Sequence, residues 1–157
     1  MHLDKCPDCL AEKQNREAFR PRLPMRRKNS LELVHTDVCQ ADVKSHAGAQ
    51  YFVTFIDDYS WKLWVSTLKT KDQVLSVFRE FQAKVERESG QKLKVVPTDN
   101  RGEYWGAFEE YCRYQGIRLE YTLLKMSELN GMAERMNQIM MERVWCMLAH
   151  AKLPKTY

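Results

Sequence analysis

The stretch YFVTFIDDYSWKLWVSTL, residues 51–68, places two runs of aromatic and β-branched residues on either side of a short polar turn. Such residues favour strands, and two runs joined by so short a turn are typical of a β-hairpin. The preceding run, LELVHTDV at residues 31–38, is also apolar and β-leaning. Together the three runs predict an antiparallel meander.

Helical and strand patterns alternate after this meander. Residues 70–90 carry apolar residues at helical spacing, with Thr70 and Gln73 as a capping box and Gly90 as a stop. The remaining expected elements are a strand at 92–99, a helix at 103–116, a strand at 117–123 and a long helix at about 127–150. Alternation of this kind is typical of crossover units. We therefore expect an α/β fold with a mixed five-stranded sheet and helices on both faces.

The last helix has an uneven composition. Its apolar residues predict a buried face that consists of Met136, Ile139, Met140 and Met147. Glu134 then lies on the adjoining polar face, flanked in sequence by Asn130 and Asn137. A solvated glutamate is the ordinary interpretation of this position, and a ligand role requires partners from elsewhere in the chain.

The composition excludes several classes of protein. The chain has 157 residues, 44% hydrophobic and 29% charged, which suits one globular domain with a real core. No apolar run approaches the length that spans a membrane, so we expect no membrane partner. Its five cysteines are an odd number without a disulfide-scaffold spacing. A reducing compartment, cytosol or nucleus, fits this pattern.

The positive charge is concentrated near the start of the chain. The net charge is +4, and residues 13–28 hold seven basic residues against one acid. A basic arm beside a neutral body suggests contact with nucleic acid, and a solubilising tail is the alternative. The candidate nucleic-acid-binding residues of this arm are Lys13, Arg16, Arg20, Arg26, Arg27 and Lys28.

Three acidic residues stand at informative places. Asp37 and Asp99 lie near the ends of the expected first and fourth strands, and Glu134 lies in the first turns of the last helix. Unpaired carboxylates are costly in apolar surroundings, and a cation with oxygen ligands removes that cost. If the first and fourth strands are neighbours, all three acids could converge. They could then hold two Mg²⁺ ions for phosphoryl transfer on a nucleic acid.

Six segments together carry a family resemblance. They are residues 31–38, 51–65, 98–104, 108–117, 130–137 and 147–155, and they span nearly the whole chain. In this order they resemble the integrase of copia-type retrotransposons, within the retroviral integrase family. The resemblance implies an RNase H-like fold and a catalytic site of Asp37 (HTD), Asp99 (TDN) and Glu134 (AERMN) with Mg²⁺ or Mn²⁺.

The resemblance also implies an activity and partners. Family members trim the DNA ends of their element and then use the freed 3′ hydroxyls to attack host DNA. The implied partners are element and target DNA and further copies of the integrase. The implied location is the nucleus, or a cytoplasmic virus-like particle before import. Asn130 would lie near the substrate, although a helix-start role is an equal alternative.

The leader resembles half of a zinc-binding module. Cys6 and Cys9 match the cysteine pair of a His, His, Cys, Cys module, but only His2 precedes them. A closed structural zinc site needs four ligands, so we expect no Zn²⁺ here and favour two unbound thiols. Residues 1–29 are thus expected to be a remnant of the module with a basic linker. Residues 30–157 are expected to be a catalytic core shortened at its C-terminal end.

Several residues depart from the family pattern. Arg101 replaces a usual glycine, Pro97 stands inside an expected strand, and residues 122–131 lack the usual prolines and glutamines. The 34 residues between Asp99 and Glu134 are one fewer than is typical. We therefore expect the isolated chain to be weak or inactive. Two functions stay open: an integrase core, or an inactive relic that keeps the fold and binds nucleic acid.

Remaining aromatic, histidine and cysteine residues are interpreted as structural. His35 alternates with Asp37 and is expected to be packed rather than in contact with substrate. Base stacking is conceivable for three tryptophans, but core or interface packing is favoured for Trp61, Trp64 and Trp105. Cys39, Cys112 and Cys146 are expected to behave as small apolar residues.

Overall fold

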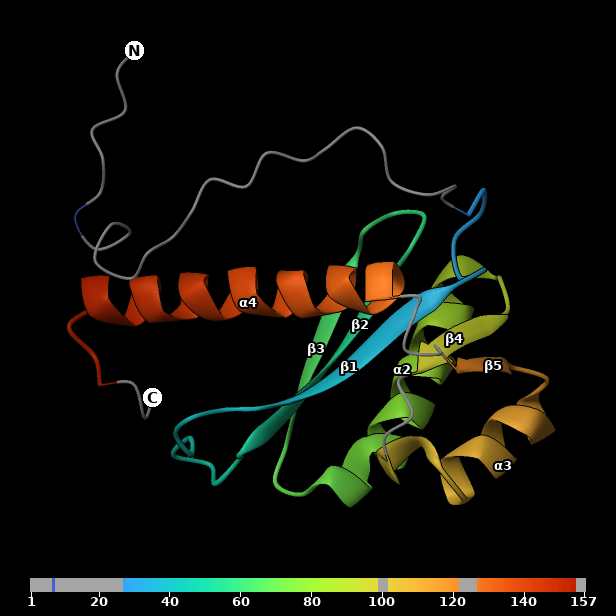
Figure 1. Ribbon diagram of the computed structural model, residues 1–157, viewed down its shortest axis with the longest axis horizontal. Coiled ribbons are helices and arrows are strands. Elements are labelled where there is room, and N and C mark those ends of the chain that lie inside the picture. Colours follow the sequence, from blue (N-terminus) through green and yellow to red (C-terminus); the bar gives the residue numbers. More distant parts are fainter. Residues whose placement is uncertain (1–6, 8–26, 99–101, 122–126, 155–157) are drawn as a thin grey trace, which may run out of the picture.

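The computed structural model describes residues 7, 27–98, 102–121 and 127–154, and in α4 it describes side chains from residue 134 onward (Figure 1). Its strands are β1 Val34–Gln40, β2 Tyr51–Asp57, β3 Leu63–Leu68, β4 Val95–Thr98 and β5 Arg118–Tyr121. Its helices are α2 Val74–Ser89, α3 Ala107–Gln115 and α4 Ser127–His150, with short 3-10 turns η1 Lys71–Gln73 and η2 Gly102–Tyr104. The element order therefore confirms the predicted order of strands and helices.

The strands form two hydrogen-bonded groups that lie side by side. β1, β2 and β3 are an antiparallel meander in that order, as predicted, and β4 pairs in parallel with β5. β1 and β4 are neighbours, and the backbone N–H of Lys94 donates to the carbonyl of Leu31 over 3.0 Å. The five predicted strands are thus present, but the ladder between the two groups is not continuous.

Pro97 contributes to this break. The N–H of Arg118 donates to the carbonyl of Lys94 over 2.8 Å, and Val95 is opposite Arg118 in the parallel register. The backbone N–H and C=O groups of successive residues in a strand point to opposite neighbouring strands. Val96 and Thr98 therefore direct their backbone N–H and C=O groups to β5. Pro97 then directs its backbone to β1. A proline has no N–H to donate, so the β1–β4 ladder lacks a donor at this position.

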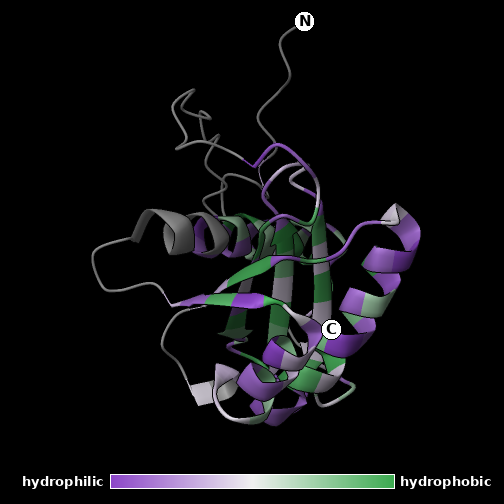
Figure 2. Ribbon diagram, turned by 90° about the vertical axis from the view of Figure 1, so that its right-hand side faces the viewer, coloured by the Kyte–Doolittle hydropathy of each residue, from purple (hydrophilic) through white to green (hydrophobic). Residues whose placement is uncertain are grey.

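Helices cover both faces of the strands, as predicted (Figure 1). The face that meets α2 and α3 holds a cluster of buried side chains, among them Val34, Val53, Phe55, Phe78, Phe81 and Phe108. Phe55 stacks on Phe81 with ring centroids 4.2 Å apart, and Phe78 lies 4.8 Å from Phe108. Figure 2 shows hydrophobic residues on the central strands and hydrophilic residues over the outer sides of the helices. This cluster is the main core of the domain.

The predicted helix ends are largely confirmed. Gly90 and Gly116 end α2 and α3 in the left-handed region, with φ of 68° and 71°. The side chain of Gln73 accepts a hydrogen bond from the backbone of Thr70 over 3.3 Å, as a capping box requires. The first strand, however, begins at Val34 rather than Leu31. Leu31 has φ of 61° and its N–H is bound by Asp57, so the chain turns there.

The prediction for the buried face of α4 was wrong in part. Met147 is 63% exposed, whereas Asn137 and Cys146 are buried. Figure 1 shows the cause: α4 crosses β1 and β2, and its C-terminal half extends past the strands. Met147 therefore remains exposed although it is apolar. No helix of the described segments is long and apolar enough to cross a membrane.

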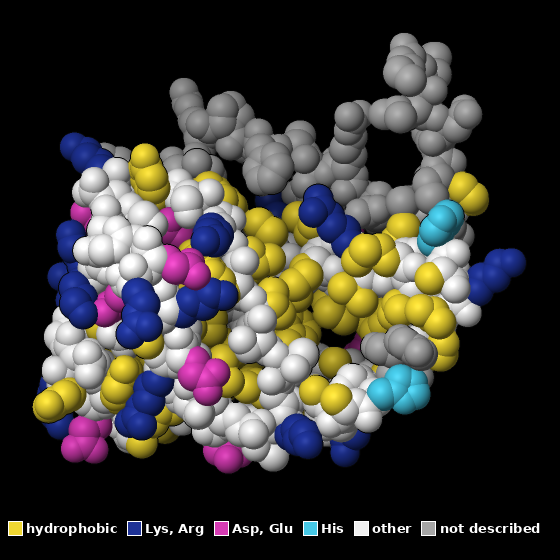
Figure 3. Space-filling view, turned by 180° about the vertical axis from the view of Figure 1, so that it is seen from behind, with side chains coloured by type: hydrophobic (Ala, Val, Ile, Leu, Met, Phe, Trp, Pro, Cys, Tyr) yellow, Lys and Arg dark blue, Asp and Glu magenta, His cyan; other side chains and the backbone are white. Residues whose placement is uncertain are grey.

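The rear surface has two regions of different chemistry. Figure 3 shows hydrophobic side chains gathered in a hollowed band across its middle, with Lys and Arg side chains gathered on the side of α3 and β5. Among the exposed large hydrophobic residues are Val65 at 44% and Leu153 at 39%. Larger exposed apolar surfaces commonly mark contacts with other proteins.

Candidate active site

Asp37 lies on the α4-facing side of β1. Side chains alternate along a strand, so Val34, Thr36 and Val38 face the main core while His35, Asp37 and Cys39 face α4. The Oδ2 atom of Asp37 accepts hydrogen bonds from Asn137 Nδ2 over 2.7 Å and from Cys39 Sγ over 3.2 Å. The amide of Asn137 also donates to Cys39 Sγ over 3.2 Å. The Asp37 carboxylate is therefore oriented by groups from both β1 and α4.

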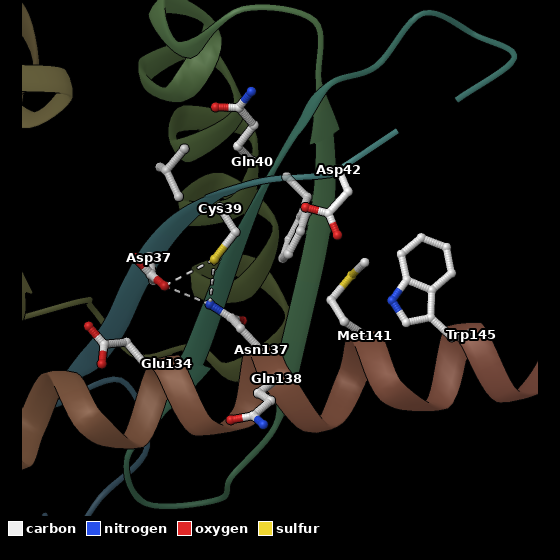
Figure 4. Close-up of a pocket in the computed structure, with 11 residues that line it drawn as sticks. Asp37, Cys39, Gln40, Asp42, Glu134, Asn137, Gln138, Met141 and Trp145 are labelled. Atoms are coloured by element: carbon white, nitrogen blue, oxygen red, sulfur yellow. Dashed lines mark hydrogen bonds between the residues drawn. The ribbon is translucent and has the colours of Figure 1, made fainter. Parts of the chain in front are cut away.

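Glu134 lies one helical turn before Asn137, on the same cavity. This cavity has a volume of about 420 Å³ and is lined by Asp37, Val38, Cys39, Gln40, Asp42, Phe52, Glu134, Asn137, Gln138, Met141 and Trp145. In Figure 4, Asp37 and Glu134 lie at the same end of the cavity, one on the strand and one on the helix. Two of the three acids that the sequence singled out therefore line one cavity. Their catalytic roles remain predictions.

The second acid, Asp99, lies outside the described residues. It directly follows Thr98, the last residue of β4, and β4 is the neighbour of β1. Among the side chains that the structure describes, no three from His, Cys, Asp or Glu are grouped closely enough to hold a metal ion. The predicted metal site is thus neither assembled nor contradicted by the described residues.

Asn137 carries an unused oxygen at this site. Its side chain is buried at 4% exposure, and its Oδ1 atom has no hydrogen-bond partner among the described residues. A carboxylate only accepts hydrogen bonds, so the amide must direct its nitrogen to Asp37 and its oxygen elsewhere. Buried polar atoms without partners are uncommon and require an explanation. A hard cation, which prefers oxygen ligands, is a chemically suitable partner for this oxygen and for the neighbouring carboxylates.

Asp57 and Asp58 anchor the segment that enters β1. Asp57 is fully buried and accepts hydrogen bonds from the backbone of Leu31 at 2.8 Å and the hydroxyl of Ser60 at 2.6 Å. Asp58 Oδ1 lies 3.1 Å from His35 Nε2, and its Oδ2 accepts from the backbone of Arg27 at 2.8 Å. Burial raises the pKa of Asp58, but these bonds outweigh it, and the net shift lowers the pKa. His35 is packed, as expected, at 2% exposure.

Most of the predicted nucleic-acid-binding residues are not described by the structure. Outside the described residues are Lys13, Arg16, Arg20 and Arg26, together with the possible zinc ligands Cys6 and Cys9. Asn130 lies within α4, but its side chain is not described. Arg27 and Lys28 are exposed, while their backbone N–H groups bind Asp58 and Glu32. The end of the arm is thus held by its backbone, and its side chains face solvent.

The structure identifies site residues that sequence reasoning missed. Asn137 was noted only as a neighbour of Glu134, Cys39 only as an apolar residue, and Met141 and Trp145 not at all as site residues. Cys39 makes polar contacts with Asp37 and Asn137, so the apolar interpretation was wrong for it. A signal was available, because Glu134, Gln138, Met141 and Trp145 are spaced four, three and four residues apart. That spacing places them on one face of a helix.

Sequence comparisons place nearly the whole chain in one group of proteins. It is 52% identical over 154 residues to the "Retrovirus-related Pol polyprotein from transposon TNT 1-94" of Nicotiana tabacum, covering 97% of the chain and 12% of that relative. It is 32% identical over 152 residues to the transposon RE1 polyprotein of Arabidopsis thaliana, covering 97% and 10%. No protein-family model matches the chain. The chain therefore corresponds to a small part of much longer relatives.

A solved structure shows the same fold. A chain of the simian T-cell lymphotropic virus intasome, in complex with PP2A regulatory subunit B56 gamma, matches with a TM-score of 0.68 at 19% identity. The match covers 97% of this chain and 53% of that one. It confirms the predicted RNase H-like α/β fold. Over nearly its whole length the chain is therefore similar to one segment of retrotransposon Pol polyproteins, and it shares its fold with a chain of a viral intasome.

Proposed function

We propose that this domain is an integrase catalytic core that trims DNA 3′ ends and joins them to target DNA. The observation that carries the proposal is the shared cavity of Asp37 on β1 and Glu134 on α4, with Asn137 bonded to Asp37. These two acids are far apart in sequence, and only the packing of α4 across β1 brings them together. The likeness to retrotransposon polyproteins and to an intasome chain supports the same reaction class.

Asp37 and Glu134 at the cavity suit a divalent cation, and in this proposal Asp99 is the third residue that would hold it. Bound Mg²⁺ or Mn²⁺ would supply an activated water or hydroxyl and would neutralise charge on the phosphate under attack. Asn137 and Cys39 hold Oδ2 of Asp37 from two sides, which fixes the carboxylate before substrate arrives. Glu134 is exposed and can meet a substrate that enters from solvent.

The first step in this proposal is hydrolysis at a DNA end. A water oxygen attacks phosphorus, the bond from phosphorus to the 3′ oxygen breaks, and that oxygen leaves as a 3′ hydroxyl. In the second step the 3′ hydroxyl attacks a target phosphodiester and displaces another 3′ oxygen. Because both steps exchange one phosphorus–oxygen bond for another, one set of carboxylates serves both.

The partners and location follow as proposals from the same assignment. DNA is the substrate, and the side chains of Arg27 and Lys28 are exposed where they could contact its phosphates. The uncovered apolar residues Val65, Met147 and Leu153 suit contacts with further copies or further segments of an integrase. Such a protein would act in the nucleus, after passage through a cytoplasmic virus-like particle.

A second candidate is an inactive relic that keeps the fold and binds nucleic acid. Pro97 favours it, because the missing donor lies between β1 and β4, the strands that carry Asp37 and lead to Asp99. A site that is loosely held can bind metal yet turn over slowly. The two candidates share the fold and differ in the alignment of the acids.

The deciding experiment compares the parent with Asp99→Asn and Asp37→Asn, and with Asp72→Asn as a control. Asp72 is an exposed acid on η1, away from the cavity. Mg²⁺ or Mn²⁺ is titrated while thermal unfolding is followed, and a labelled duplex DNA end is then offered for cleavage and joining. Proteins with equal far-UV circular dichroism are compared, so that misfolded variants are set aside.

For an integrase core we expect metal-dependent stabilisation and DNA joining in the parent and in Asp72→Asn, and neither in the two site variants. Metal-dependent stabilisation without cleavage or joining supports the relic. Equal behaviour of all four proteins with metal would overturn the metal site itself.

A further inference from the structure

The candidate cavity continues along α4 beyond the acids. Glu134, Gln138, Met141 and Trp145 form one stripe of the helix, and all four line the cavity. Figure 4 shows the Trp145 ring standing out from α4 on the same side as Met141, while Glu134 lies at the opposite end. At ~1.5 Å of rise per residue, Glu134 and Trp145 are roughly 16 Å apart along the helix axis. The cavity therefore has two distinct ends.

The end at Trp145 is apolar and aromatic. Phe52 of β2 is opposite Cys39 of β1 in the antiparallel register, so both face α4. Phe52 is buried at 7% exposure and lines the cavity together with Met141 and Trp145, which are partly buried. This end offers a flat hydrophobic surface to a ligand.

Charge argues against a phosphate at this end. Asp42 is exposed and lines the cavity near Met141 (Figure 4), and no Lys or Arg is among the lining residues that the structure describes. A phosphate would be repelled by this carboxylate and would gain nothing from the apolar lining residues. A nucleobase suits both features, because it is uncharged and has a flat π-face that stacks on aromatic rings. Gln40 and Gln138 are exposed amides at the rim that can both donate to and accept from a base edge.

We propose that Trp145, with Met141 and Phe52, is a stacking site for an unpaired nucleobase of the DNA strand whose phosphate lies at Asp37 and Glu134. The base must be unpaired, because a base inside a duplex has its faces covered by its neighbours. The roughly 16 Å of helix between Glu134 and Trp145 assigns the base to a nucleotide beyond the one under attack. This inference rests on the proposed action on DNA. The added contact can be tested by measuring DNA affinity, without any catalytic step.

The test measures binding to fluorescently labelled duplexes by the parent, Trp145→Ala, Trp145→Phe and the control Trp105→Ala. Trp105 is 53% exposed and does not line the cavity. One duplex has a short single-stranded tail at the end, a second has an abasic tail of equal length, and a third is blunt. Binding is measured in EDTA, so that no cleavage occurs, and folding is checked by circular dichroism and thermal unfolding.

We expect Trp145→Ala to bind the tailed duplex roughly 5- to 100-fold more weakly than the parent, the size of one lost base–aromatic stack. Trp145→Phe should retain most of the affinity, because phenylalanine still offers a ring. Trp105→Ala should match the parent, and the blunt and abasic duplexes should bind the parent and Trp145→Ala equally.

Three results would overturn the stacking site. The first is equal affinity of the parent and Trp145→Ala for the tailed duplex. The second is an equal loss on tailed and abasic duplexes, which would mean a backbone contact. The third is a change of oligomeric state in light scattering, which would mean that another copy covers Trp145. None of these three results would count against the proposed reaction. The proposed reaction is tested separately, by the metal titration and DNA joining of Asp37→Asn and Asp99→Asn.

Discussion

Asn137 on α4 donates a hydrogen bond over 2.7 Å to the carboxylate of Asp37 on β1, and so ties the last helix to the first strand at the candidate site. The amide is buried, and its other atom, Oδ1, has no partner among the described residues. The contact joins the two elements that bring Asp37 and Glu134 together. It therefore links the stability of the fold to the geometry of the site.

The first prediction concerns this contact. Asn137→Ala should lower the free energy of unfolding by about 1–3 kcal/mol, because a hydrogen bond to a charged group is lost in a buried place. It should also reduce metal-dependent DNA cleavage, because Asp37 loses one of the groups that orient it. Urea unfolding and a cleavage assay measure the two effects. Lys84→Ala on the exposed face of α2 serves as the control, and a loss of the same size there would count against a specific role.

The second prediction concerns acid stability and Asp58. Its folded-state pKa is lowered, so its contribution is present above the unfolded value of 3.8 and is lost as pH falls through the folded pKa. Asp58→Asn should lower the free energy of unfolding at neutral pH by about 1–3 kcal/mol and flatten its decline below pH 3.8. Urea unfolding from about pH 2 to about pH 7 measures this change.

The control for this loss of stability at acidic pH is Asp72→Asn, which removes an exposed carboxylate of η1. In this variant the free energy of unfolding should decline at acidic pH as it does in the parent. If Asp58→Asn keeps the full acid dependence of the parent, the pair with His35 does not stabilise the fold.

The third prediction concerns Pro97. Pro97→Val should introduce an N–H directed at β1, so the new amide and the amides of β4 should exchange more slowly with deuterium. The free energy of unfolding should rise by about 0.5–1.5 kcal/mol from the added hydrogen bond, partly offset by the greater freedom of the unfolded chain. Pro154→Val, outside the sheet, measures that offset alone. Fast exchange of the new amide at position 97 would show that β1 offers no acceptor there.

The fourth prediction concerns thiol reactivity. Burial raises the pKa of Cys112 to about 12, and its side chain is fully buried. N-ethylmaleimide at neutral pH should therefore leave Cys112 unmodified in the folded protein and modify Cys39, which is partly exposed at the cavity. Peptide mass spectrometry resolves the two sites, and urea-unfolded protein provides the fully modified reference. Early modification of Cys112 would mean that the α3 region opens readily.

The order and type of the elements could be predicted because they depend on local patterns. Alternating β-branched and aromatic residues marked β2 and β3, and Gly90 and Gly116 marked helix ends. Asp37, near the end of an apolar strand, and Glu134, in the first turns of the last helix, could be singled out once their motifs HTD and AERMN had shown the family resemblance. These features are properties of a few neighbouring residues and do not depend on the packing of distant segments.

The phase of α4 against the sheet could not be predicted from its sequence. Methionines surround much of that helix, so hydrophobic spacing allowed a stripe through Met147 as readily as one through Asn137 and Cys146. The sheet decided between them, because it presents Asp37 to Asn137 on the buried side of α4. Apolar residues near the end of such a helix can be exposed, although the hydrophobic pattern predicts that they are buried.

The sequence by itself therefore determined the α/β fold class, the helix ends and two of the acids at the candidate site. Only the tertiary structure decided that Asn137 holds Asp37, that Trp145 lies at the far end of the cavity and that the backbone of Pro97 faces β1. The reason is physical: a local pattern sets the conformation of a segment, whereas a site depends on which faces of distant segments meet. That choice is made by the packing of the whole core.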